Sequence, residues 1–236
     1  MKIYKSANEA TNESCVYALG CFDGVHVAHA KVISEAVRVA RTLGTKSGVW
    51  CFSEPPKNAF LKVPVPLLCD AEKKAELIAG LSVDVLICPD FDGEIRDISA
   101  ENFVFDILKK NAGAVHIVTG KNYTFGKGGV GNTELLSRLC ESAGIGLTVL
   151  DDVYYNGTKV SSSAVRDAVS IGDVATAELL LGRRFCLRVE SRNDTLVVME
   201  KLACPPDGVY SLDLCGDVTA NNARVLVKNR TVVVDG

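Results

Sequence analysis

The sequence has little histidine, little tryptophan and no long hydrophobic run. Three of its 236 residues are histidine, one is tryptophan, and aromatic residues make up 6%. Its longest apolar runs, such as AVHIV at 114–118, are far shorter than the about 20 residues that a membrane-spanning helix needs. The N-terminal segment MKIYKSANEATNES lacks the hydrophobic core of a signal peptide. We therefore expect neither membrane association nor export.

Neither sign of charge dominates. The net charge of −3 and the pI near 5.7 argue against a basic surface that binds nucleic acid.

The nine cysteines contain no C-x-x-C pair, and those inside apolar runs, such as Cys51 and Cys88, are typical of buried reduced thiols. Cysteines and histidines do not cluster at the spacing of zinc ligands. The expected location is the reducing cytoplasm.

Strand and helix patterns alternate over the first three-quarters of the chain. Apolar segments predict strands at 15–20, 47–52, 83–88, 114–119 and 146–152. Capped, helix-period segments predict helices at 29–43, 70–80, 99–110 and 132–144. An Asn-Gly pair in VYYNGTKV predicts a tight hairpin, and two short helices follow it. The alternation predicts an α/β domain with a parallel sheet covered on both faces.

After Gly182 the helical period disappears, and short strand segments separated by turns follow. We therefore divide the chain into a first domain at 1–185 and a small all-β region at 186–236. Some five short strand segments are few for a closed barrel, whose interior every strand must help to fill. A small sheet is expected instead, which contributes stability or the contacts of a homodimer.

Two of the histidines, His26 and His29, lie three residues apart after a glycine-containing turn, where a helix is predicted to begin. Residues at this spacing project to the same side, and a helix N-terminus favours phosphate. A second predicted helix start, in KVSSSAVR, places Ser161–Ser163 just before Arg166, and hydroxyl and guanidinium groups also bind phosphate. Taken alone, each feature is more often structural: a histidine at such a turn is a cap or a packed residue, and KVSSSAVR is a serine-capped helix start with an exposed arginine. Together, at one edge of a parallel sheet, they predict a polyphosphate ligand.

These motifs resemble those of a known family. GCFDGVHVAH resembles the G-x-F-D-G-x-H-x-G-H motif of prokaryotic FAD synthetases, and KVSSSAVR is similar to the I-S-S-T-x-I-R motif of the wider nucleotidylyltransferase superfamily. VTGKNYTFGKGGVGNTELL and GDVATAELLLGRRF resemble two further segments of the flavin enzymes. The resemblance covers residues 12–186 and implies a Rossmann-like nucleotidylyltransferase domain. It also implies small-molecule substrates: AMP passes from ATP to FMN, forming FAD and pyrophosphate, with Mg²⁺ held mainly by the ATP phosphates.

Position by position, the resemblance assigns residues to two sites. The residues that it implies for ATP are Gly20, Phe22, Asp23, Gly24, His26, His29, Ser162, Ser163 and Arg166. His26, His29 and Arg166 are the expected catalytic residues among them. The residues that it implies for the flavin are Asn122, Tyr123, Phe125, Phe52, Pro55 and Pro56. The metal ligands stay open, because Asp23 either orients the first turn or contacts magnesium.

Two departures from the family pattern stand out. Ala28 replaces the second glycine of the histidine motif, which adds a methyl group where the backbone is expected to approach the phosphates. Ala28→Gly is therefore predicted to speed or tighten the use of ATP. The family's Phe-x-Pro-x-Pro segment reads FSEPP here, which bears on the flavin contacts.

Other interpretations remain open. GKGGVGNT at 126–133 matches a P-loop except that Asn132 replaces its lysine, and the same glycines match a dinucleotide-binding pattern that does not directly follow its strand. A non-catalytic flavin- or nucleotide-binding regulator, or a transferase for another phosphate acceptor, would use the same fold. PPDGVYSLDL resembles a strand of riboflavin kinases, but the kinase's G-x-P-T-A-N stretch does not precede it. Riboflavin kinase activity is therefore not expected.

Overall fold

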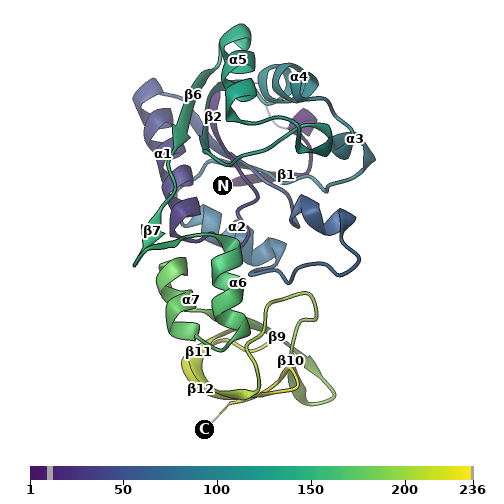
Figure 1. Cartoon of the computed structure of the whole chain (residues 1–236), viewed down its shortest axis with the longest axis vertical. Coiled ribbons are helices and arrows are strands. Elements are labelled where there is room, and N and C mark those ends of the chain that lie inside the picture. The colour runs from purple at the N-terminus through teal and green to yellow at the C-terminus, as the bar shows by residue number, and fades with distance from the viewer. Residues whose placement is uncertain (10–12, 235–236) are drawn as a thin grey trace. The chain divides into compact units, whose positions relative to one another are not determined.

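The computed structural model describes residues 1–9 and 13–234. Two compact units make up the chain (Figure 1). The first comprises Met1–Phe22, Ala28–Pro64 and Ala71–Asp152, and the second comprises Asp23–Val27, Val65–Asp70 and Val153–Gly236. The division at 185/186 instead follows the change from helices to strands in the sequence, and it stays a prediction about folding domains.

The first unit contains a parallel sheet and the helices that connect its strands. Its strands are β1 (Lys2–Tyr4), β2 (Cys15–Leu19), β3 (Lys46–Trp50), β4 (Val85–Ile87), β5 (Ala114–Gly120) and β6 (Gly146–Leu150). Its helices are η1 (Ala7–Glu9), α1 (Val27–Leu43), η2 (Pro56–Phe60), α2 (Ala71–Ala79), α3 (Gly93–Arg96), α4 (Ala100–Asn102), η3 (Phe103–Asn111), η4 (Lys127–Gly129) and α5 (Thr133–Ala143). Val27, the first residue of α1, belongs to the second unit.

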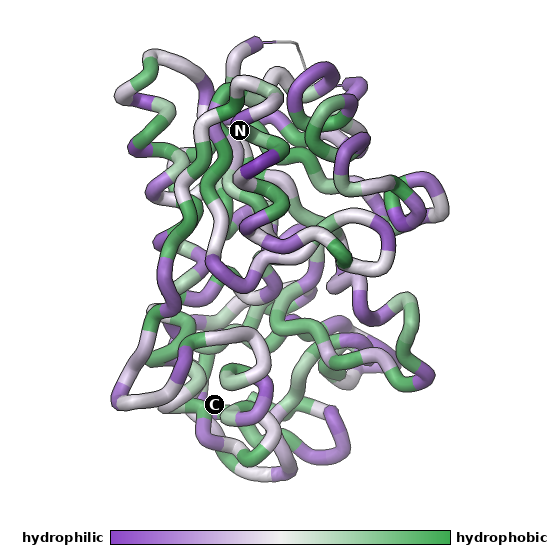
Figure 2. The backbone as a smooth tube through the Cα atoms, turned by 45° about the horizontal axis from the view of Figure 1, so that its top comes forward, coloured by the Kyte–Doolittle hydropathy of each residue, from purple (hydrophilic) through white to green (hydrophobic). Residues whose placement is uncertain are grey.

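The six strands lie in the order β1-β4-β3-β2-β5-β6, and all neighbouring pairs are parallel. Every residue of β2 and of β4 is buried, as expected for strands covered on both faces. Figure 2 shows hydrophobic residues running along the strands of this sheet. The predicted α/β class is confirmed. The three-residue strand β1 was not predicted, because so short an edge strand carries no periodic signal.

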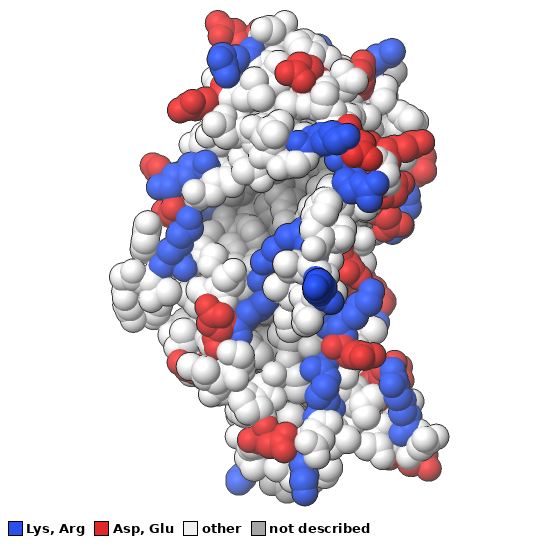
Figure 3. All heavy atoms as spheres, turned by 45° about the vertical axis from the view of Figure 1, so that its right-hand side comes forward, with Lys and Arg blue, Asp and Glu red and all other residues white. Residues whose placement is uncertain are grey.

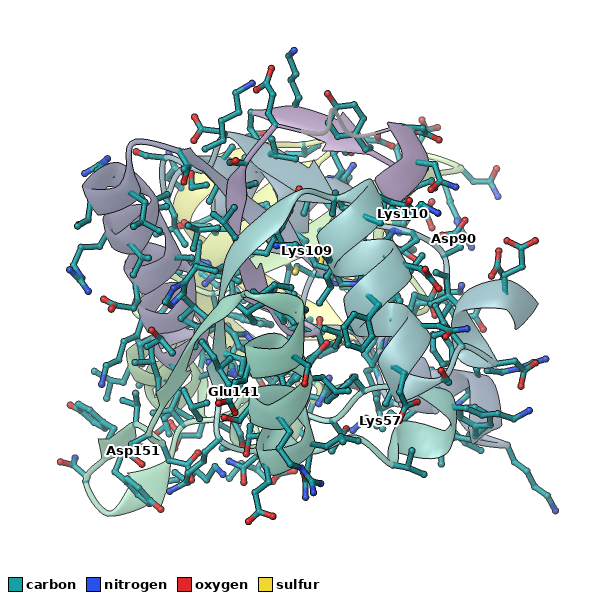
Figure 4. All side chains as sticks on the ribbon, turned by 90° about the horizontal axis from the view of Figure 1, so that it is seen from above. Lys57, Asp90, Lys109, Lys110, Glu141 and Asp151 are labelled. Atoms are coloured by element: carbon teal, nitrogen blue, oxygen red, sulfur yellow. The ribbon has the colours of Figure 1, made fainter. Side chains whose placement is uncertain are left out.

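Helices cover both faces of the sheet. Figures 1 and 4 show α1 on one side and α5, marked by Glu141, on the other. Tyr17 and Leu19 of β2 pack with Phe103 of η3 and Leu136 of α5 in one buried cluster. This arrangement follows from the topology, because the chain leaves β2 toward β3 but leaves β5 in the opposite direction.

The helix predicted at 99–110 has an α-helical start and a π-helical remainder. The Ser99 hydroxyl accepts a hydrogen bond from the Asn102 backbone N–H at 3.0 Å, which caps α4. The segment Phe103–Asn111 then continues as the π-helix η3. Sequence patterns locate the helix but do not separate these two hydrogen-bond registers.

The second unit contains a hairpin, two helices and a β region. Its elements are β7 (Tyr154–Tyr155), β8 (Thr158–Lys159), α6 (Ser162–Ser170), α7 (Val174–Leu181), β9 (Cys186–Arg192), β10 (Thr195–Val198), β11 (Gly208–Gly216), β12 (Ala220–Lys228) and β13 (Thr231–Val234). The hairpin turn predicted at Asn156-Gly157 is present, with φ of 47° and 78° at these two residues. The two predicted helices and all five predicted strand segments are present too.

The expectation of a small open sheet in the C-terminal region was wrong. The five strands form a closed barrel in the order β10-β13-β12-β11-β9. Five are enough because β11 and β12 are nine residues long, and β11 pairs with both β12 and β9. Each strand supplies at least one of the buried residues Leu187, Val189, Val198, Leu212, Leu214, Val225, Val227 and Val232. These side chains give the barrel its core.

Candidate active site

Three neighbouring strands of the first unit end where predicted site residues begin. Leu19 of β2 is paired with Trp50 of β3 and with Thr119 of β5, so the carboxyl ends of these strands lie side by side. Gly20 and Phe52 lie one and two residues beyond β2 and β3. The strand order reverses between β2 and β5, and ligands of such sheets bind beyond the strand ends at that position.

The turn after β2 has an unusual backbone. Phe22 has φ of 52°, Gly24 of 78° and Val25 of 40°. Two features require glycine at position 24. A Cβ there would lie 2.8 Å from Leu68 Cβ, and the backbone has the left-handed conformation that side chains disfavour. Positive φ at phenylalanine and valine is strained, and such strain persists only where surrounding structure enforces it, often at functional sites.

Asp23 is the centre of a hydrogen-bond network in the second unit, where it is 1% exposed. Its Oδ1 accepts a hydrogen bond from the Leu68 backbone N–H at 3.0 Å, and its Oδ2 accepts one from Arg166 Nη2. Its backbone carbonyl accepts a hydrogen bond from Ser162 Oγ at 2.9 Å. Because both carboxylate oxygens are engaged, these contacts favour the role of orienting the turn over that of a magnesium ligand.

The second motif lies at the start of α6, in the same unit as Asp23. Ser161 caps the helix, since its Oγ accepts a hydrogen bond from the Ala164 N–H at 3.1 Å. Ser163 is exposed. Arg166 Nε donates a hydrogen bond to the Pro66 carbonyl at 2.6 Å, and the Arg166 side chain is 12% exposed. Within the second unit, the structure therefore joins Asp23 of the first motif to Ser162 and Arg166 of the second.

The two histidines differ in surroundings. His26 is 4% exposed, and burial lowers the pKa of its imidazole to about 4, with the positive charges of Arg183 and Arg166 adding to the effect. Burial therefore favours the neutral imidazole, which has one N–H donor and one acceptor nitrogen. His29 lies in the first turn of α1, where its ring meets the ring of Phe22 edge-on, with centroids 5.2 Å apart.

The predicted flavin residues differ in their surroundings. Tyr123 and Phe125 stack with ring centroids 5.8 Å apart and planes 9° apart, and burial raises the pKa of Tyr123. Phe125 is only 6% exposed and packs in the core against Phe103, so the ring of Tyr123 stacks on a core residue. Asn122 is exposed, and its Nδ2 donates a hydrogen bond to Asp152 Oδ1 at 2.8 Å.

The FSEPP segment follows β3. Phe52 is half-buried, and its ring meets that of Phe91 edge-on, with centroids 5.2 Å apart. Pro55 is buried and precedes the 3₁₀-helix η2, whose first residue is Pro56. Proline fits the start of a helix because it lacks an N–H that would have no partner there.

Comparisons with known proteins bear on this site. A sequence model of the FAD synthetase family matches residues 8–164. The chain belongs to the FAD synthetase family. The resemblance inferred from the motifs is therefore confirmed, together with the fold class.

Individual relatives cover most of the chain. A bifunctional riboflavin kinase/FMN adenylyltransferase from Pseudomonas fluorescens is 30% identical, over 95% of this chain and 76% of its own length. An FAD synthetase from Listeria monocytogenes is 29% identical, over 91% of this chain and 87% of its own length. A crystal structure from Streptococcus pneumoniae, described as a macrolide-efflux protein, is 24% identical with a TM-score of 0.82. It covers 99% of this chain and 84% of that one, and it supports the fold alone.

Three findings bear on partners. Of the described residues, none belongs to a helix long and apolar enough to cross a membrane. Within 1–9 and 13–234, no group of three or more His, Cys, Asp or Glu side chains could hold a metal ion. Figure 3 shows Lys and Arg interspersed with Asp and Glu on the face that it draws, and the expectation of no nucleic-acid partner stays a prediction.

The family's glycine is replaced by Ala28, which is the second residue of α1 and half-buried. Ala28 is not among the residues with positive φ, so its backbone does not call for glycine. The prediction that its methyl group crowds the phosphates stays a prediction.

The glycine-rich segment before α5 is a closed loop. Phe125 and Gly131 form an antiparallel bridge, with N–H···O distances of 3.1 and 2.9 Å. Asn132, at the position of a P-loop lysine, caps α5, because its Oδ1 accepts a hydrogen bond from the Leu135 N–H at 2.9 Å. Capping explains this asparagine without any phosphate contact.

Sequence reasoning missed two cations that contact the turn after β2, the buried Lys74 and the half-buried Arg183. In the first unit, Lys74 Nζ donates a hydrogen bond to the Cys21 carbonyl at 3.3 Å. In the second unit, Arg183 donates to the carbonyls of Gly24 at 2.6 Å and Val25 at 3.0 Å. Arg183 lies in the GRRF stretch, which carries a resemblance to the flavin enzymes but no signal for this contact. Lys74 lies in a helix rich in charged residues, so no sequence signal separates it from its exposed neighbours.

Proposed function

We propose that this protein transfers AMP from ATP to FMN and thereby makes FAD and pyrophosphate. Membership of the FAD synthetase family supports this proposal, and its relatives include proteins named FMN adenylyltransferase. The observation that carries it is the joining of the two phosphate motifs at Asp23. One motif supplies the turn before His26, and the other supplies Ser162 and Arg166.

The reaction needs no covalent intermediate on the protein. An oxygen of the FMN phosphate attacks the α-phosphorus of ATP, a new P–O bond forms, and the bond to the bridging oxygen breaks so that pyrophosphate leaves with its electrons. The protein has to position the two substrates and stabilise the charge that develops. We propose MgATP as the substrate form, in which the ATP phosphates hold most of the coordination positions of the ion.

Each motif has a role in this proposal. Neutral His26 donates a ring N–H, and His29 adds a second donor at the start of α1. The backbone N–H groups of Ser162 and Ser163, in the first turn of α6, face the β and γ phosphates. Arg166 stabilises the leaving pyrophosphate, while Asp23 orients both the turn and the guanidinium.

The test is a product assay with ATP and Mg²⁺ over four acceptors: FMN, nicotinamide mononucleotide, phosphopantetheine and glycerol phosphate. Of the four acceptors, we expect only FMN to react, giving FAD and pyrophosphate. We also expect kcat to be about a hundredfold lower in His29→Ala and in Arg166→Ala, because losing one donor to the charge that develops on the phosphates costs about 3 kcal/mol. Turnover of another acceptor would assign a different transferase. Tight binding of FMN or ATP without any pyrophosphate would assign a regulator.

Two finer proposals concern the barrel. The outer face of the barrel carries Val209, Leu226 and Val233 as directly paired neighbours, which are 57%, 42% and 58% exposed. This apolar row supports a homodimer through the barrel, which sedimentation would detect as a concentration-dependent doubling of mass.

The segment before β11 reads ESRNDTLVVMEKLAC rather than G-x-P-T-A-N, which supports an absence of riboflavin kinase activity. FMN formed from riboflavin and ATP by the purified protein would contradict this.

A further inference from the structure

Lys74 is a buried cation for which the proposed reaction has no direct use. It lies in the middle of α2 and is 1% exposed. A buried ammonium group is costly unless hydrogen bonds replace its water, and it has three N–H donors. Lys74 Nζ donates to the carbonyls of Cys21 at 3.3 Å, Phe52 at 2.7 Å and Ser53 at 3.1 Å. Three backbone carbonyls thus accept hydrogen bonds from this one ammonium group.

The three carbonyls belong to two different turns. Cys21 lies between Gly20 and Phe22, in the turn after β2 that carries predicted ATP residues. Phe52 and Ser53 open the turn after β3 that carries predicted flavin residues. The two strands are neighbours, since Leu19 is paired with Trp50. Lys74 reaches both turns from a third element, so one side chain ties them together within the first unit.

We infer that Lys74 is a positioning residue that fixes the ATP turn and the flavin turn relative to each other. The inference rests on the proposed function, because that function assigns the two turns to the two substrates. Backbone carbonyls held by one buried cation leave each turn little freedom to shift. Substrate alignment is sensitive to such shifts, since a displacement of about 1 Å can lower a rate about a hundredfold.

The neighbouring lysine offers a matched control. Lys73 lies on the same helix, but its Nζ pairs with the exposed carboxylate of Glu76 at 2.9 Å. Lys73→Met and Lys74→Met make the same chemical change one residue apart. Lys74→Gln keeps two N–H donors on a shorter side chain and serves where Lys74→Met does not fold.

The experiment measures kcat, KM for ATP and KM for FMN at a temperature where circular dichroism shows every variant folded. Calorimetric titration with ATP and fluorescence titration with FMN give the two dissociation constants without turnover. We expect Lys74→Met to raise both KM values and both dissociation constants and to lower kcat/KM by about a hundredfold, Lys74→Gln to lie between, and Lys73→Met to match the wild type.

A purely structural role of Lys74 predicts a lower melting temperature with unchanged KM values in the folded protein, and that result would overturn the inference. A change for one substrate alone would overturn the link between the turns. If the wild type binds FMN and ATP but forms no FAD, the proposed function fails, while the two binding titrations still decide the role of Lys74. A wild type that binds neither nucleotide overturns both.

Discussion

The guanidinium of Arg166 donates a hydrogen bond to the carboxylate of Asp23, across 143 residues of sequence. Both groups lie largely out of solvent, with side-chain exposures of 12% and 2%. Each charge therefore depends on the other for the interactions that water would otherwise provide. The pair holds the turn of the histidine motif against the start of α6, so it serves stability and the geometry of the phosphate site together.

Asp23→Ala should destabilise the protein by about 3 kcal/mol, because it leaves a buried guanidinium without its counter-charge. Urea unfolding of Asp23→Ala, Arg166→Met and the double variant measures this. We expect the double variant to be more stable than the sum of the two single effects predicts. Glu35→Ala, which breaks the exposed ion pair with Arg38, is the control and should change the midpoint little. Additive effects at Asp23 and Arg166 would argue against an energetic link.

Asn122→Ala should weaken FMN more than ATP. Asn122 follows β5 at the predicted flavin site, and Asp152 holds its amide through a 2.8 Å hydrogen bond. Losing one hydrogen bond to the substrate corresponds to about a tenfold increase in KM for FMN. Asp152→Ala should act in the same direction but more weakly, because it only frees the amide. Steady-state kinetics with each substrate varied in turn measure KM for FMN and KM for ATP. An equal increase of both KM values would contradict the placement of Asn122 at the flavin site.

Stability should fall as the pH is lowered from about 6.5 toward 4, partly because of His26. Burial lowers the pKa of its imidazole to about 4 from an ordinary value of 6.5. Between these values the unfolded chain binds a proton that the folded protein excludes, so stability is fully present above pH 6.5 and is lost as the pH falls through the folded pKa. The loss is on the order of 3 kcal/mol.

His26→Gln, which cannot titrate, is the comparison for this pH dependence. Melting temperatures between pH 7 and pH 4 should fall less steeply in the variant than in the wild type. Parallel curves would mean that carboxylates alone cause the acid sensitivity.

Asn132→Ala should destabilise α5 by about 1 kcal/mol, the typical effect of losing a helix N-cap, without changing the kinetics. Asn132→Lys, which completes the P-loop pattern, should not improve the use of ATP, since the position caps a helix. Thermal unfolding and KM for ATP measured on both variants check these two expectations. A marked drop of KM for ATP in Asn132→Lys would revive the P-loop interpretation.

Much of the fold could be predicted because its signals are local. Buried strands such as Cys15–Leu19 are apolar throughout, and helices such as Thr133–Ala143 carry a cap at one end and glycine at the other. Barrel closure could not be predicted, because it depends on a long-range parallel pairing of β9 with β11. No local pattern encodes the pairing of Cys186 with Asp213.

The candidate site divides in the same way. Its glycines, histidines and serines form contiguous motifs that a sequence reveals. The contacts that fix those motifs come from residues distant in sequence, such as Lys74 and Arg183, whose types are common on any surface. The burial of Phe125 was also beyond reach, because an aromatic residue in a loop is equally compatible with a binding surface and with the core.

Closure of the barrel should depend on Gly216, which pairs with Val189 across the parallel contact between β11 and β9. Its φ is +106°, and a Cβ there would lie 2.1 Å from the Val189 carbonyl oxygen. Gly216→Ala must therefore move the strands apart as well as strain its own backbone, and it should destabilise the barrel by more than about 2 kcal/mol. Gly157→Ala is the matched control, since Gly157 also has a positive φ of +78° but nothing within 4 Å of the added carbon. Urea unfolding together with hydrogen exchange at β9 and β11 measures both variants. Equal effects of the two changes would mean that backbone strain alone matters and that the barrel closes without this close approach.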